Sequence, residues 1–370
     1  MEFSIIFLLY LSYVVYRANQ EHQSGVITQF MRNLLYASVG LMIFAGVSML
    51  GISASGPELA EYAEQNADAV VIDVDTGSAL LAFFMASFMA YASFILIRSS
   101  EARLRLQGLI GNVRMQETEI IDPEEKILPP ANINRGSYNP DSVVHTTAIV
   151  LCFLMLTIQI ITFVAIGGVS GMADDIETEG IASTEVIIQA VAQLLLVFIG
   201  VGWATRRTMP QILERLGLRL PNGDDWRWGI GAGVMLIGLI MVFGIIIGIL
   251  VELGLAPDQS ANNEAADSLV RAFSTIPLAI ILSASAAIGE EILFRGALQP
   301  VFGNLAVSII FALMHTQNLF SPGILIIFAV SYVLGIIRQR QSTSAAIIGH
   351  FVYNFTQLLL FMAASSVAGA

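Results

Sequence analysis

One short stretch of the sequence combines an apolar helix with three ionisable side chains. Residues 281–299 read ILSASAAIGEEILFRGALQ, so Glu290, Glu291 and Arg295 follow a run of small and apolar residues. A charged side chain at the centre of a bilayer costs roughly 2.5–3.5 kcal/mol, so such groups need partners or a purpose. Glu291 and Arg295 stand four residues apart on one helix face and can pair, whereas Glu290 points about 100° away. The unpaired Glu290 carboxylate is therefore the candidate for proton transfer.

Two downstream apolar segments each place a histidine in an i,i+4 pattern. Phe311 precedes His315 by four residues, and His350 precedes Asn354 by the same spacing. The chain has only four histidines, so half of them lie in these patterns. A carboxylate withdrawn from water is a better base at neutral pH, and imidazole or amide N–H groups can face a developing oxyanion. Together the residue types favour hydrolysis of a peptide bond inside a membrane.

The three motifs in this order, Glu-Glu-x-x-x-Arg, Phe-x-x-x-His and His-x-x-x-Asn, resemble the CPBP family. That family contains the type II CAAX prenyl endopeptidases and their bacteriocin-processing prokaryotic relatives. The resemblance covers roughly residues 185–362, with no departure at the motif positions, and implies nothing about the first part of the chain. It implies an intramembrane endopeptidase.

The resemblance also implies a role for each motif residue. Glu290 would be the base that activates water, and His315 would share that water. His350 and Asn354 would lie on the oxyanion side. Glu291 and Arg295 would hold the helix and the cavity in shape, and Phe311 would support the site by packing beside His315.

A metal mechanism stays open beside this one. Glu290, His315 and His350 form a carboxylate and two histidines, a ligand set that zinc hydrolases use, and CPBP proteins have often been called metalloproteases. However, the sequence has no His-Glu-x-x-His motif, and an archaeal member of the family resembles a metal-free glutamate protease. The expectation is a site without a cofactor, with zinc at these three residues as the alternative.

Composition places the chain in the membrane. Of its 370 residues, 56% are apolar and only 12% are charged, and the mean hydropathy is +0.75. Soluble proteins carry about a quarter charged residues, so we expect an all-α polytopic membrane bundle. The net charge is −12 and no nucleic-acid-binding patch is evident, so no nucleic-acid partner is expected. The sole cysteine, Cys152, excludes an intramolecular disulfide and lies in an apolar run that makes a thiol inert.

Hydropathy predicts about ten transmembrane helices, most of them close to the ~20 residues that cross a bilayer, although the first is short. They are expected at 3–16, 34–53, 77–97, 143–166, 185–204, 228–251, 272–298, 301–315, 323–337 and 343–362. A cleaved signal peptide is the alternative for the first. A Pro-rich stretch divides the chain into an N-terminal membrane unit at 1–97, a cytoplasmic linker at 98–142 and a second membrane unit at 143–370, with the protease core at about 185–362.

The loops alternate between basic and acidic, which predicts the orientation. Arginines gather around residues 98–135 and 206–227, whereas the loops around 58–75, 174–179 and 252–267 are acidic. The positive-inside rule then places both termini outside and the basic loops in the cytoplasm. From the cytoplasmic edge, Glu290 lies at roughly 12 Å, His350 at roughly 10 Å and His315 at roughly 20 Å, so one cavity opening to the cytoplasm can hold all three.

The partners follow from this reading. The expected substrate is a membrane-associated protein or peptide in the lipid bilayer. The alternative from another class is a non-catalytic protein of the same fold that binds a membrane protein or peptide, for example in immunity to a bacteriocin. A transporter using Glu290 and His315 as a proton relay is disfavoured because the sequence has no inverted repeat of broken helices.

Overall fold

The computed structural model describes residues 2–65, 74–110, 136–178, 180 and 182–368, and within these ranges the chain is built from helices without a β-strand. Eight of these helices are long and apolar enough to cross a membrane, which confirms the predicted all-α polytopic membrane bundle. These spans are Gln29–Gly56, Thr76–Arg98, Val143–Ala165, Ser183–Gly200, Gly223–Glu252, Ile276–Phe302, Gly323–Arg340 and Thr343–Ala364. The two other predicted spans form the helices α1 and α13, and α13 is short.

The described residues form the α-helices α1 to α15. They are α1 (Glu2–Gln20), α2 (Gln29–Gln65), α3 (Thr76–Arg98), α4 (Ser100–Ile110), α5 (Val143–Ala165), α6 (Gly168–Thr178), α7 (Ser183–Gly200), α8 (Met209–Leu216), α9 (Gly223–Glu252), α10 (Ser260–Ala272), α11 (Ile276–Glu291), α12 (Gln299–Phe302), α13 (Asn304–Met314), α14 (Gly323–Arg340) and α15 (Thr343–Ala368). In the predicted linker, α4 forms a helix that the sequence did not suggest, and residues 111–135 of that linker lie outside the described residues.

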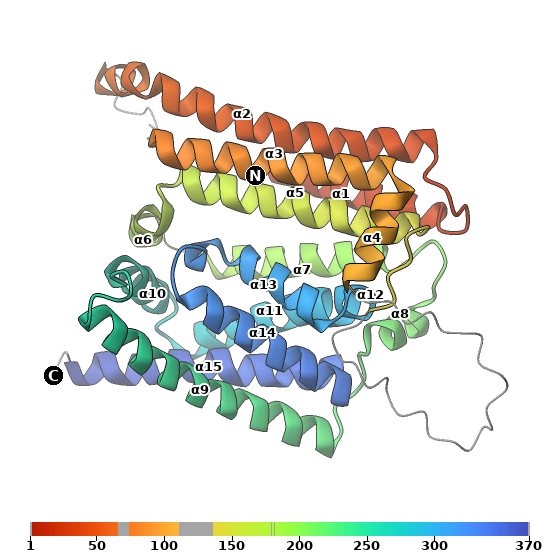
Figure 1. Cartoon of the computed structure of the whole chain (residues 1–370). Coiled ribbons are helices and arrows are strands. Elements are labelled where there is room, and N and C mark those ends of the chain that lie inside the picture. The colour runs from red at the N-terminus through yellow and green to blue at the C-terminus, as the bar shows by residue number, and fades with distance from the viewer. Residues whose placement is uncertain (1, 66–73, 111–135, 179, 181, 369–370) are drawn as a thin grey trace.

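The short polar helices cap the two ends of the bundle. Figure 1 shows α6 and α10 at one end and α4 and α8 at the opposite end. At the first, which we call the acid-rich end, Glu177 on α6 pairs with Arg271 on α10 at 2.7 Å. The other we call the Arg-rich end, and its arginines include Arg103, Arg105, Arg206, Arg207 and Arg215.

The N-terminal helices pack against the rest through small side chains. One apolar core joins α1, α2, α3 and α5, and α3 contributes Ala79, Ala82 and Ala90 to it. A Cβ at Gly46 of α2 would lie 3.0 Å from the Cβ of Ala86, so the two helices approach closely. Lipid tails are as apolar as side chains, so such close packing is what holds membrane helices together. The predicted N-terminal unit is therefore in direct contact with α5.

The position of α15 is set by two glycines of α9. A Cβ at Gly229 would lie 2.7 Å from the Cβ of Ile348, and one at Gly233 would lie 2.6 Å from Cγ1 of Val352. The pair is a Gly-x-x-x-Gly pattern, which lets two membrane helices approach at backbone distance. The helix α15 carries His350, so this contact fixes the depth of that side chain.

The start of α15 is fixed by a buried carboxylate. Asp225, in the first turn of α9, is fully buried and accepts hydrogen bonds from Arg219 at 2.9 and 3.0 Å and from Ser342 at 2.7 Å. Next to it, Thr343 donates to the carbonyl of Leu216 at 2.5 Å. Buried charges in proteins are paired and hydrogen-bonded because an isolated charge is expensive to desolvate. This network ties the turn between α14 and α15 to α8 and α9.

Candidate active site

The centre of the candidate site is Glu291, at the end of α11. Its side chain is fully buried, and each carboxylate oxygen has a partner. Oε2 accepts a hydrogen bond from Nε of Arg295 at 3.0 Å, and Oε1 accepts one from Nδ1 of His350 at 2.9 Å. The i,i+4 pair that the spacing predicts is therefore present, and a second partner arrives from α15. Glu291 joins two of the three motifs.

Arg295 extends this cluster to α14 and α13. Its terminal nitrogen donates to Oγ of Ser331 on α14 at 2.8 Å, and its guanidinium carbon lies 5.4 Å from the ring centroid of Phe311 on α13. The side chain is fully buried. A guanidinium over an aromatic face gains a cation–π attraction, which is stronger when water is excluded. Arg295 thus links α11, α13 and α14 around one charge.

The backbone changes form at this point. The α-helix ends at Glu291, and Ile292–Leu298 continue as a π-helical segment. Such segments are rare and occur frequently at functional sites, because they redirect side chains within a helix. The carbonyls of Gly296 and Ala297 accept hydrogen bonds from Arg215 of α8 at 2.9 and 3.2 Å. The π-helical segment is therefore supported from the Arg-rich end.

Phe311 is the common neighbour of the ionisable groups. Its ring centroid lies 4.6 Å from that of His315 and 6.5 Å from that of His350. It also packs edge-on against Phe294, with centroids 4.9 Å apart. The ring excludes water from one side of the cluster, so polar groups there interact in a medium of low dielectric.

His315 lies at the end of α13, where its geometry fixes the tautomer. Its Nδ1 is 2.8 Å from the carbonyl oxygen of Phe311. A carbonyl only accepts, so Nδ1 carries the hydrogen and the neutral ring keeps a free lone pair on Nε2. That nitrogen can accept a hydrogen bond from water. His350 is oriented in the same manner, because a carboxylate holds its Nδ1 and leaves Nε2 to face other groups.

Glu290 differs from its neighbour in that one of its carboxylate oxygens has no hydrogen-bond partner among the described residues. The residue is half-buried, and its Oε2 atom is buried without a hydrogen bond to any described residue. A buried polar atom without a partner costs free energy and marks a strained, catalytic or solvated position. Of the two adjacent glutamates, Glu291 has a hydrogen-bond partner on each carboxylate oxygen, whereas Glu290 has an oxygen that is free to accept a hydrogen bond.

The other predicted residue, Asn354, follows His350 by one turn of α15 and is half-buried. Its side chain makes no hydrogen bond with the described residues. The structure thus joins Glu291, Arg295, His350 and Phe311 by direct contacts, with His315 against Phe311. It does not bring Asn354 into that hydrogen-bonded cluster, and the predicted roles of all these residues stay predictions.

Two further polar residues lie beside the site without an obvious motif. Ser331 holds Arg295, and a Cβ at Gly289 would lie 2.8 Å from Oε1 of Gln193 on α7. A serine or glutamine in an apolar helix is a weak signal, because most such residues form ordinary interhelical hydrogen bonds. The sequence signal that could have found them is only their polarity within apolar segments.

The donor set of the zinc alternative does not form a compact group. In the part of the chain that the structure describes, no three histidine, cysteine, aspartate or glutamate side chains are placed to hold one metal ion. His350 instead directs its Nδ1 to Glu291, and His315 directs its Nδ1 to a backbone carbonyl. A metal bound by Glu290, His315 and His350 would require these three side chains to move closer to one another.

A small cavity lies at the acid-rich end, on the His315 side of the bundle. It measures about 100 Å³, and its lining includes Thr316 and Gln317, the residues that follow His315, together with Asn262 of α10. Asn262 donates to the carbonyl of Gln317 at 2.9 Å, which closes α10 over the end of α13.

Comparison with known proteins agrees with the motif resemblance. Residues 272–356 match a family profile described as type II CAAX prenyl endopeptidase Rce1-like. The matched segment holds all three motifs, from the Glu290 pair to Asn354. Searches of curated proteins and of solved structures gave no match. The match covers residues 272–356 alone, and it shows that this part of the chain is similar to the Rce1-like type II CAAX prenyl endopeptidases of the CPBP family.

Proposed function

We propose that this protein is an intramembrane endopeptidase that hydrolyses a peptide bond with water activated by Glu290, without a metal. The observation that carries the proposal is the contrast between the two adjacent glutamates. Glu291 has both oxygens occupied by Arg295 and His350, whereas Oε2 of Glu290 is buried and unpaired. A general base needs an oxygen within reach of the proton that it abstracts.

In this scheme Glu290 takes one proton from a water molecule as the water oxygen bonds to the scissile carbonyl carbon. The carbonyl oxygen then carries the negative charge of the tetrahedral intermediate. When the C–N bond breaks, Glu290 returns its proton to the leaving amine nitrogen. The base is thus regenerated, and the products are a new carboxyl terminus and a new amine.

The histidines supply the neighbouring polar groups. His315 accepts a hydrogen bond from the attacking water through Nε2, because its Nδ1 is engaged with a carbonyl. His350 and Asn354, one turn apart on α15, face the developing oxyanion. Glu291 orients His350 by accepting a hydrogen bond from its Nδ1, and Arg295 holds Glu291 in place. Zinc bound by Glu290, His315 and His350 is the alternative form of the same peptidase.

The substrate that suits this site is a membrane-associated protein or peptide. The Glu290 and His350 motifs lie on helices long and apolar enough to span a membrane, so a soluble chain would have to leave water to reach them. The Arg-rich end is proposed to face the cytoplasm, with both termini outside and the active-site cavity opening to the cytoplasm. Substrates would then enter from the cytoplasmic leaflet.

The test is a comparison of membrane proteomes. Membranes that carry the wild-type protein are compared with membranes that carry Glu290→Ala, and Glu185→Ala on the exposed first turn of α7 is the matched control. The proposal expects an uncleaved precursor to accumulate with Glu290→Ala alone. Identical termini of all membrane proteins in the three samples would contradict it.

A further inference from the structure

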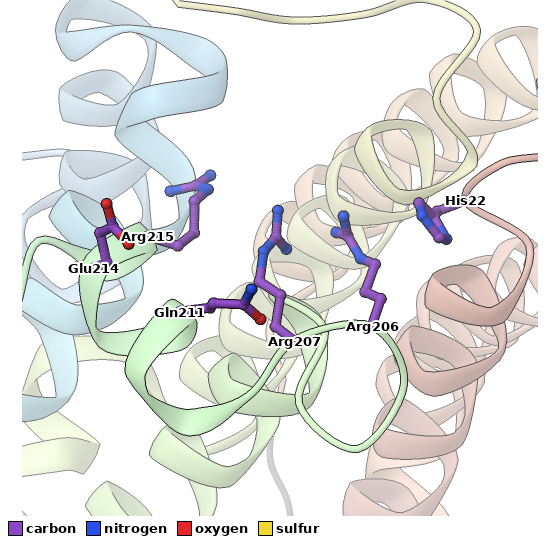
Figure 2. Close-up of a pocket in the computed structure, with 6 residues that line it drawn as sticks. All are labelled: His22, Arg206, Arg207, Gln211, Glu214 and Arg215. Atoms are coloured by element: carbon purple, nitrogen blue, oxygen red, sulfur yellow. The ribbon is translucent and has the colours of Figure 1, made fainter.

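A second built site lies at the Arg-rich end, away from the peptidase motifs. A cavity of about 440 Å³ is lined by His22, Arg206, Arg207, Gln211, Glu214 and Arg215. Figure 2 shows the guanidinium groups of Arg206 and Arg207 on the same side of the cavity, with His22 facing Arg206. The volume falls within the range of small-molecule sites, roughly 300–1,000 Å³. The peptidase scheme uses none of these side chains.

The loop between α7 and α8 is folded so that two adjacent arginines point into this cavity. The backbone N–H groups of Arg206 and Arg207 both donate to the carbonyl of Gly202 at 3.0 Å. Gly202 has φ of 107°, and Ala204 has φ of 61°, which a residue with a Cβ rarely adopts. Backbone strain of this kind persists only where the surrounding structure imposes it, and it gathers at ligand sites.

Each arginine is anchored by part of its side chain only. Arg206 donates through Nε to Asn19 at 2.8 Å, and Arg207 donates through one terminal nitrogen to the carbonyl of Val201. Asn19 in turn donates to the carbonyls of Ile199 and Gly200 at the end of α7. A guanidinium has five N–H donors, so several are left for an occupant of the cavity.

The positive charge of this site is not neutralised by described residues. Among them, no carboxylate lies within ion-pair distance of Arg206, Arg207 or Arg215, although Glu214 lines the cavity. Burial and the neighbouring charge of Arg207 lower the pKa of Arg206 to about 10. Burial, followed by the charges of Arg207, Arg338 and Arg206, lowers the pKa of Arg215 to about 10. Both remain cationic at neutral pH, and an anion would relieve their repulsion.

The surroundings place the site at the edge of the membrane. The loop follows directly after the membrane-spanning helix α7, and Trp203, Met209 and Leu213 expose 37%, 39% and 39% of their surface beside it. Ile212 and Leu216 on the other face of α8 are fully buried. An amphipathic helix with exposed aromatic and aliphatic side chains is typical of the headgroup layer, where anionic lipids attract arginines.

We propose that this Arg-lined cavity binds the phosphate group of an anionic membrane lipid. The guanidinium fork matches phosphate oxygens in a bidentate manner, and two adjacent forks with a histidine suit a group with several oxygens. Arg215 also donates to the carbonyls of Gly296 and Ala297, so it connects this lipid site with the π-helical segment that follows Glu291. The proposal does not depend on peptidase activity.

The experiment measures lipid binding by the purified full-length protein. Phosphatidylglycerol and phosphatidylcholine are offered in equal amounts, and retained lipid is read by native mass spectrometry and by the melting temperature in nanodiscs. The variant is Arg206→Gln with Arg207→Gln, and the control is Arg227→Gln, an exposed arginine at the same end of the bundle. A lost charged hydrogen bond costs roughly tenfold or more in affinity, so the variant should lose selective retention and the control should keep it. The single variant Arg207→Gln carries the same expectation if the double variant does not fold.

A second arm separates the source of the phosphate. Inorganic phosphate is titrated into detergent-purified protein against chloride at equal ionic strength. Stabilisation by phosphate that anionic lipid displaces supports the lipid site. Stabilisation by phosphate without any selective lipid retention assigns the cavity to a soluble anion and overturns the lipid assignment. Equal lipid binding by the wild type and the arginine variant also overturns it.

Discussion

The buried pair of Glu291 and Arg295 gives a prediction for which a second ion pair in the same chain serves as the control. Both side chains have no exposed surface, and their closest N···O distance is 3.0 Å. In Glu291→Gln, Arg295 stays buried and charged without its counter-charge. Removal of one partner from a buried ion pair costs about 3–5 kcal/mol, because the remaining charge is left desolvated. On the scale of globular domains this is a fall in melting temperature on the order of 10 °C.

An exposed pair with the same spacing serves as the control. Glu101 and Arg105 are also four residues apart, with an N···O distance of 2.6 Å, but their side chains are 72% and 78% exposed. Exposed pairs contribute roughly 0–1 kcal/mol because water already solvates both charges. Glu101→Gln should therefore change the melting temperature only slightly.

The assay is the melting temperature of the detergent-purified protein for the two single variants and for Glu291→Gln combined with Arg295→Met. The double variant removes the orphaned charge and should be more stable than Glu291→Gln alone, because an apolar residue of similar volume can replace a buried ion. Equal melting temperatures for Glu291→Gln and Glu101→Gln would refute the reasoning. A double variant less stable than Glu291→Gln would show that the orphaned charge is not the cause.

Three other outcomes are expected. Gly233→Ala should destabilise the protein by about 1–3 kcal/mol through overpacking against α15, whereas Gly231→Ala, which has open space around it, should not; equal denaturation curves would contradict this. In a Cys152→Ala background, cysteines at the exposed Ser137 and Ser170 should react oppositely with an impermeant thiol reagent, Ser170→Cys from outside; identical labelling would overturn the orientation. A chelator should leave the cleavage rate unchanged, and a loss of rate that zinc restores would replace the metal-free mechanism.

The fold class and the order of the helices could be predicted because they follow from local properties. Runs of about 20 apolar residues indicate transmembrane helices, and the motifs lie on or at the end of the helices that hydropathy predicts. The i,i+4 pair of Glu291 and Arg295 likewise depends only on helix geometry. The two polar ends of the bundle followed from the alternation of charge between loops.

The contacts between helices could not be predicted, since no spacing rule gives the rotation of one helix against another. The hydrogen bond from His350 to Glu291 is such a contact, and so is the hydrogen bond from Arg295 to Ser331. The sequence predicted one continuous helix over 272–298, but the structure changes to a π-helical segment at Ile292. Within that segment α8 packs closely against Gly296, where a Cβ would lie 3.0 Å from Leu216.

The proposed role of Glu290 is tested most directly by the rate at which Glu290→Gln cleaves the precursor. This precursor is the protein that accumulates in membranes carrying the inactive Glu290→Ala variant. The amide keeps the shape and the hydrogen-bonding capacity of the side chain but cannot accept the proton. General-base catalysis contributes typically 10²–10⁴-fold, so the rate should fall by about that factor while the melting temperature stays at the wild-type value. If Glu290→Gln cleaves at the wild-type rate while a folded Glu291→Gln is inactive, the roles of the two glutamates are reversed and the account is contradicted.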